Sequence, residues 1–166
     1  MRVAFIFRLF LFFLALSNWV VSEGWSSERF VDNKDGTITD TLMGIVWIKD
    51  PETIPTLRGN LGWTQARDAC DELVYAGIGP KKWRLPVITE LRGLVDETVR
   101  TPRIDQIFGA LGEPYWTSVD SNETVGSKTW AVDFKDGGVD TYNKTSLVNP
   151  VKLRARCCRE SRLHAD

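Results

Sequence analysis

Most tryptophans of this chain stand in short motifs, which limits the folds that the chain can adopt. The 166-residue sequence holds seven tryptophans. Five stand in the motifs GIVWIKD (Trp47), GWTQARDAC (Trp63), KKWRLP (Trp83), PYWTS (Trp116) and KTWAVDF (Trp130). Each indole brings a large apolar area and one N–H group that needs a partner when buried. The strand-like contexts predict one compact domain with Trp47, Trp83, Trp116 and Trp130 in its core, whereas Trp63 is a candidate for the surface.

The N-terminal segment has the pattern of a secretory signal. Arg2 is followed by an apolar run over 3–21, which is densest at Leu9–Leu16. We therefore expect residues 1–22 to be a signal peptide, 23–28 a polar lead, 29–160 the folded domain and 161–166 a tail. An uncleaved anchor is the alternative, although Arg8 would be costly inside a membrane. After cleavage we expect no membrane span and a location in the periplasm, at the cell surface or outside the cell.

The net charge and the cysteines limit the ligands and the cross-links that we expect for this protein. Residues 1–22 contain two arginines and no acid, so their removal takes the formal net charge from −1 to −3. This mild acidity argues against general nucleic-acid binding. The three cysteines are Cys70, Cys157 and Cys158. An exported domain favours one disulfide, and because a bridge between adjacent cysteines is strained, Cys70 is expected to pair with one of the other two.

The order of predicted elements is strands, two helices, then strands. Turn residues at 33–36 and 136–138 predict two hairpins. Apolar spacing predicts one helix capped by Thr64 and a second capped by Thr89. Strands are predicted at 30–32, 37–40, 45–48, 115–118, 129–133 and 151–157. This segregation predicts an α+β fold with antiparallel sheets.

Catalytic and metal-binding patterns are weak. The single histidine, His164, stands near the end of the chain, so no histidine-based triad or zinc cluster can be assembled. The acidic stretch 32–40 resembles a calcium loop, but Lys34 occupies a ligand position, and Asp35-Gly36 favours a hairpin turn. We therefore predict no enzyme activity, no cofactor and no metal site.

The final predicted strand carries a row of cations. Lys152, Arg154 and Arg156 alternate with Leu153, Ala155 and Cys157. On a strand this places the cations on one face, over about 13 Å at roughly 3.3 Å per residue. Such a row is a candidate binding site for sulfates or carboxylates of a polyanion. The alternatives are a charged face that prevents aggregation, or internal salt bridges.

These motifs, taken in order, resemble a known family. RFVDNKDGTITDTLMGIVW, ARDAC, KKWRLPVITELRGLVD, PYWTS, TWAVDFKDGGV and RARCCR are similar to the domain at the C-terminus of the Legionella collagen-like adhesin, over residues 29–160. The resemblance implies a C-type-lectin-like fold with two helices and two small antiparallel sheets. It also implies a Cys70–Cys157 disulfide, which leaves Cys158 as a packed thiol or an intermolecular link. The lectin calcium motif is lacking, since Glu113-Pro114 is followed by Tyr115 rather than Asn.

The same resemblance sets the functional expectation. In the adhesin that gives the family its name, the domain is associated with trimerisation and sulfated-glycan binding. We therefore expect an exported, non-catalytic binding or adhesion module, with an anionic glycan or an envelope protein as partner and a homo-oligomer as a further outcome. The alternative is an accessory subunit of an envelope complex that binds no glycan.

Overall fold

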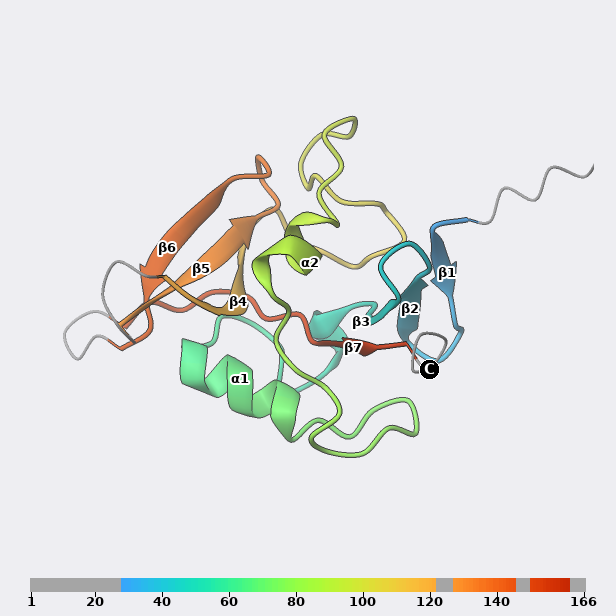
Figure 1. The fold of residues 1–166 in the computed structure, drawn as a ribbon, viewed down its shortest axis with the longest axis horizontal. Helices are drawn as coiled ribbons and strands as arrows, with labels where there is room; N and C mark the ends of the chain where they lie inside the picture. The colour runs from blue at the N-terminus through green and yellow to red at the C-terminus, as the bar shows by residue number, and fades with distance from the viewer. Residues whose placement is uncertain (1–27, 122–126, 146–149, 162–166) are drawn as a thin grey trace, which may run out of the picture.

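The computed structural model describes residues 28–121, 127–145 and 150–161. The predicted signal peptide, most of the polar lead and most of the tail, including His164, lie outside these residues. Within them the architecture is α+β, with two α-helices and two small antiparallel sheets (Figure 1). Both ends of the described chain lie beside the same sheet, since Thr41 Oγ1 donates to Glu28 O and Ser161 N–H donates to Gly44 O.

The first sheet has four strands in the order β1-β2-β3-β7. Their bounds are β1 Phe30–Asp32, β2 Thr37–Asp40, β3 Ile45–Ile48 and β7 Cys158–Glu160. All three pairings are antiparallel. The β1–β2 turn is the predicted hairpin, and Gly36 at its end has φ +87°, a conformation that glycine adopts without strain.

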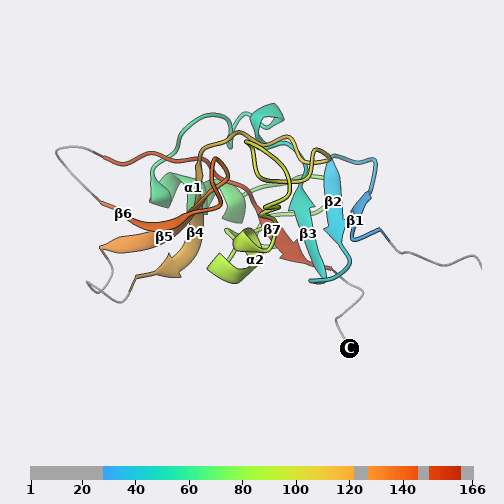
Figure 2. The same cartoon turned by 90° about the horizontal axis from the view of Figure 1, so that it is seen from above.

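The second sheet has three strands in the order β4-β5-β6, namely β4 Pro114–Asp120, β5 Lys128–Asp133 and β6 Val139–Asn143. The predicted turn at 136–138 joins β5 to β6 as an antiparallel hairpin. The two sheets lie at opposite ends of the molecule, with α2 between them (Figures 1 and 2).

Both helices begin earlier than their predicted caps. Helix α1 spans Trp63–Asp71, and its N-terminus is fixed by Gln65, whose Oε1 accepts from Gly62 N–H at 3.0 Å. Helix α2 spans Ile88–Arg92, and Glu90 Oε2 accepts from Val87 N–H at 2.8 Å. An acceptor at the third helical position closes the first turn, so these side chains do what Thr64 and Thr89 were predicted to do. A short 3₁₀ helix, η1 Pro51–Thr53, precedes α1.

Strand β3 separates two hydrophobic clusters and is buried along its whole length. Val46 and Ile48 face the cluster that contains α1, whereas Ile45 and Trp47 face the cluster that contains Leu91 of α2. Side chains alternate along a strand, so one central strand can supply two cores. The same alternation continues in the C-terminal segment. Cys157 belongs to the cluster that contains α1, the first cluster, and Cys158 belongs to the cluster that contains Leu91, the second cluster.

Three of the four tryptophans predicted for the core are buried. Trp47, Trp83 and Trp116 are 0–1% exposed. The prediction for Trp130 is wrong, since this residue of β5 is only half-buried. Trp116 Nε1 donates to Leu61 O at 2.7 Å, whereas Nε1 of Trp47 and of Trp83 has no partner in the described part of the chain.

The predicted strand 151–157 is also wrong. This segment is extended but forms only isolated bridges, Leu153 with Leu61 and Arg154 with Tyr115, and the regular strand begins at Cys158. Among the residues that the structure describes, no helix has the length and apolarity needed to cross a bilayer.

Candidate ligand-binding surface

Arg156 lies inside the protein and not in a surface row. It is 0% exposed. Its Nη1 donates to the carbonyls of Ile48 and of Lys49, and its Nη2 donates to the carbonyl of Gly109 at 2.6 Å. Burial lowers the pKa of Arg156 below its usual range. The guanidinium ties the end of β3 to the loop before β4, so the expectation that Arg156 contacts a ligand at an exposed strand face is wrong.

Arg154 is held by two carboxylates. Its Nε donates to Glu113 Oε2 at 2.6 Å, and its Nη1 donates to Glu52 Oε1 at 2.8 Å. The hydrogen bond to Glu113 is the main cause that raises the pKa of Arg154. The side chain is only 14% exposed. This is the internal salt bridge that the sequence left open as an alternative, and it joins η1 to the start of β4.

Lys152 is the exposed member of the three. The three cations therefore do not form one exposed row: Lys152 is exposed, Arg154 is paired with carboxylates, and Arg156 is buried. Anion binding by Lys152 and Arg154 stays a prediction, and a ligand that contacts Arg154 would compete with Glu52 and Glu113.

Reversing the charge of Arg154 should destabilise the fold. In Arg154→Glu a third carboxylate would lie between Glu52 and Glu113. The three negative charges would repel one another because the site is partly buried. We expect the free energy of unfolding to fall by about 2–3 kcal/mol in urea denaturation. The matched control is Lys152→Glu, an exposed reversal expected to stay within about 0.5 kcal/mol of wild type. Equal stability of the two variants would contradict the bridging role of Arg154.

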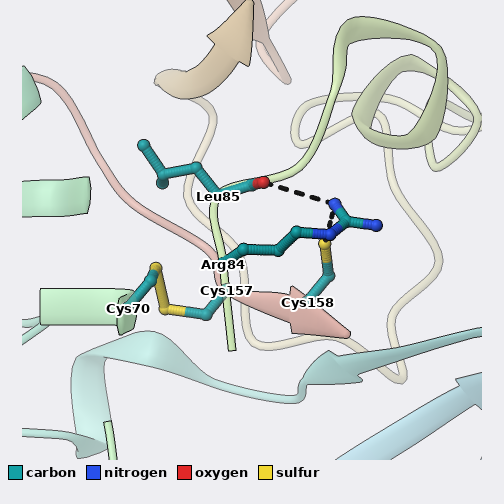
Figure 3. Close-up of a disulfide and its surroundings, with 5 residues drawn as sticks. All are labelled: Cys70, Arg84, Leu85, Cys157 and Cys158. Carbon is teal, nitrogen blue, oxygen red and sulfur yellow. Dashed lines mark hydrogen bonds between the residues drawn. A yellow bond between two sulfur atoms is a disulfide. The ribbon is translucent and has the colours of Figure 1, made fainter. Parts of the chain in front are cut away.

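The predicted disulfide is present. Cys70 of α1 is bonded to Cys157, and their Cα atoms lie 5.5 Å apart. Figure 3 shows this bond on one side of the chain and the thiol of Cys158 on the other. Cys158 is buried and unbonded to another cysteine. Of the two outcomes left open for Cys158, the structure shows the packed thiol.

An ionic cluster surrounds the Cys158 thiol. Arg84 Nη1 donates to Cys158 Sγ at 3.2 Å, and the same guanidinium makes two hydrogen bonds to Glu90 and one to Glu160. The Glu90 bonds are the main cause that raises the pKa of Arg84. Burial alone would raise the pKa of Glu90, but the bonds from Arg84 and Val87 N–H hold it below its usual value.

Sequence reasoning missed Arg84 and Glu90. Their spacing held a clue: Glu90 is the third residue after Val87, where an acid closes the first turn of a helix, and Arg84 stands in the KKWRLP motif just before it. Arg84 also pairs through its backbone with Cys158. The motif thus places Trp83 and Leu85 in the first cluster and the guanidinium beside the second.

We expect the Cys158 thiol to be unreactive in the folded protein. Burial raises the pKa of Cys158 well above its usual value, and only the thiolate is nucleophilic. A thiol-specific disulfide reagent should therefore label no cysteine in native protein and one per chain after denaturation. Rapid labelling of the native protein would show that the thiol is accessible.

Three carboxylates of the acidic stretch 32–40 already contact lysine, arginine or threonine groups of the protein. Asp32 Oδ2 contacts both Lys34 Nζ and Lys49 Nζ, and the hydrogen bond from Lys49 is the first cause that lowers the pKa of Asp32. Asp35 accepts from Thr37, and Asp40 from Arg29. Across the described residues, no group of three or more His, Cys, Asp and Glu side chains is placed to hold a metal ion.

The sequence pattern of the Lcl C-terminal domain matches residues 36–154, more than half of the chain. The chain belongs to the Lcl C-terminal domain family. The match runs from the end of the first hairpin turn to Arg154 and so includes both helices, the second sheet and the KKWRLP motif. A search of curated protein sequences gives no match.

Proposed function

We propose that this chain is an exported, non-catalytic adhesion module that binds an acidic glycan through its outer surface. Membership of the Lcl C-terminal domain family is the observation that carries the proposal, because it indicates an adhesin-like exported domain. The Cys70–Cys157 disulfide supports export, since such bonds persist in oxidising compartments. We place the protein in the periplasm, at the cell surface or outside the cell.

The proposed fold relationship is to C-type lectins. Two helices, two small antiparallel sheets and a disulfide from the first helix to the end of the chain support it. Two polar side chains of the C-terminal segment are buried and contact other parts of the protein. Arg156 donates to backbone carbonyls, and Cys158 lies beside Arg84. This leaves the exposed side chains, Lys152 among them, for recognition.

The proposal is tested by retention of the purified protein on immobilised heparin, beside an uncharged dextran resin. We expect retention on heparin alone, weakening as salt is added because exposed charges are screened. Lys152→Glu should elute at lower salt than wild type, with an unchanged Tm. Equal retention on the two resins, independent of salt concentration, would reject an acidic glycan as the ligand.

An accessory subunit of an envelope complex is the second candidate. An apolar pocket of about 430 Å³ lies between the loop after η1 and the end of α1, and Val74 at this pocket is 69% exposed. Exposed apolar surface of this kind is typical of protein interfaces. A partner that co-purifies in fixed stoichiometry, together with no heparin retention, would favour this candidate.

A further inference from the structure

The outer edge of strand β1 is open. β1 is the last strand on one side of the first sheet and lies at the rim of the molecule in both views (Figures 1 and 2). Asn33 N–H donates to Thr37 O, and bonded pairs recur at every second residue of an antiparallel pair, so Val31 also bonds toward β2. The N–H and carbonyl groups of Phe30 and Asp32 therefore point away from β2, and they bond to no other group in the described part of the chain.

The edges of β4, β6 and β7 are covered or blocked. Arg84 exchanges two backbone hydrogen bonds with Cys158 of β7, and Arg154 bonds through its backbone to β4. On β6, the Thr141 N–H faces away from β5, but Asp140 Oδ1 accepts from it at 2.6 Å. A carboxylate in this position keeps an edge strand from pairing with another chain. Within the described ranges, β1 is therefore the edge strand whose outward backbone groups all lack a partner.

The side chains of β1 do not protect its edge. A charge on an edge strand usually prevents pairing, but Asp32 Oδ2 is already neutralised by Lys34 Nζ at 3.1 Å and by Lys49 Nζ at 2.8 Å. Val31, in the middle of the strand, is an apolar side chain that is 41% exposed. Free backbone groups beside an exposed apolar side chain favour the addition of another strand.

A second copy of β1 has the chemistry to fill this edge. Antiparallel pairing about a twofold axis at Val31 places each Phe30 opposite Asp32 of the other copy, where the outward groups of both residues form hydrogen bonds. The same register places Lys34 opposite Glu28 of the other copy, on both sides of the axis. Both side chains are exposed, and opposite charges that face each other across strands stabilise the pairing.

We propose that this protein forms a twofold dimer through β1, in which the first sheets of two copies become one continuous sheet. The inference goes beyond the proposed function and does not depend on glycan binding. Each copy uses its open edge once, so assembly stops at two chains. The contact involves few residues, and interfaces of this size are typical of weak, concentration-dependent dimers.

Val31→Cys tests the register of the dimer. Residues that face each other at a non-hydrogen-bonded position have Cα atoms about 4.5 Å apart, a separation that a disulfide spans. Under mild oxidation, Val31→Cys should form cross-linked dimers at least about tenfold faster than Leu42→Cys at the same concentration, because the dimer holds its two thiols together. Leu42 is the control because it is 74% exposed and lies outside β1, in the β2–β3 turn. Equal rates for the two variants would overturn the inference.

Sedimentation of the protein without a cross-link tests the dimer itself. The dimer fraction of wild type should rise with protein concentration up to about 1 mM. Val31→Lys should raise the dimer Kd at least about tenfold, because two ammonium groups would meet at the axis, whereas Leu42→Lys should leave it unchanged. A wild type that stays monomeric throughout, or a dimer that Val31→Lys leaves intact, would overturn the inference.

A charge swap tests the contact between the two copies. Glu28→Lys and Lys34→Glu should each weaken the dimer, and the double variant should restore it, with the Tm of each variant close to that of wild type. Failure of the double variant to restore the dimer would overturn the register. Heparin retention tests the proposed function separately, since a monomer that binds heparin would refute the dimer alone.

Discussion

Replacing Arg156 by methionine should lower the free energy of unfolding by about 3–5 kcal/mol, the largest effect expected of any single substitution here. Methionine keeps most of the side-chain length but has no donor. The carbonyls of Ile48, Lys49 and Gly109 would then lose the guanidinium that joins them. Lys49 O would keep the hydrogen bond from Gly109 N–H, but no such donor is seen for the other two carbonyls in the described residues. A buried acceptor left without a partner costs about 1–3 kcal/mol, and the losses overlap because the site can partly relax.

Urea denaturation of Arg156→Met measures this cost. Arg67→Met is the matched control, since Arg67 is an exposed arginine whose hydrogen bonds go to its neighbour Asp68, and its replacement should cost less than about 0.5 kcal/mol. Arg156→Lys should fall between the two because an ammonium keeps the charge but cannot span all three carbonyls. If Arg156→Met were as stable as the control, the hydrogen bonds from the buried arginine to these carbonyls would contribute little to stability.

Removing the disulfide should lower the free energy of unfolding by a similar amount. Cys70 and Cys157 are 87 residues apart, and a cross-link over so long a stretch restricts the unfolded chain strongly. The chain-entropy relation gives about 4–5 kcal/mol for a loop of this length. We therefore expect Cys70→Ala/Cys157→Ala to lose several kcal/mol and its Tm to fall steeply.

Two comparisons isolate the effect of the bond. Cys158→Ala also removes a buried sulfur, but it breaks no cross-link and should cost about 1–2 kcal/mol. Adding a reductant should lower the stability of wild type toward that of the double variant and leave the double variant unchanged. A reductant that has no effect on wild type would mean that the cross-link contributes little.

Local patterns predicted much of this architecture because local chemistry determines it. The Asp35-Gly36 and Gly137-Gly138 turns appear where the sequence places them, since they connect strands with the required backbone. The burial of Leu153, Ala155 and Cys157 also follows from simple alternation. The helix starts were misplaced because the acceptors that fix them, Gln65 and Glu90, reach back from within the helix.

The candidate site was predicted less well, for a different reason. Alternation says on which side of the chain Lys152, Arg154 and Arg156 lie, but not what covers that side. The end of β3 and the loop near Gly109, both distant in sequence, close over Arg156. Glu52 and Glu113 reach Arg154 from two further segments. Such contacts depend on the tertiary fold, and no local pattern encodes them.

A disulfide from α1 to the C-terminal segment closes the first core, while the adjacent thiol belongs to the second. Peptide mapping by mass spectrometry tests this arrangement, with free thiols alkylated before and after denaturation and no reductant. We expect a peptide that links Cys70 to Cys157, with Cys158 alkylated only after denaturation. A Cys70–Cys158 or Cys157–Cys158 bond, or alkylation of Cys70 in the native protein, would contradict it.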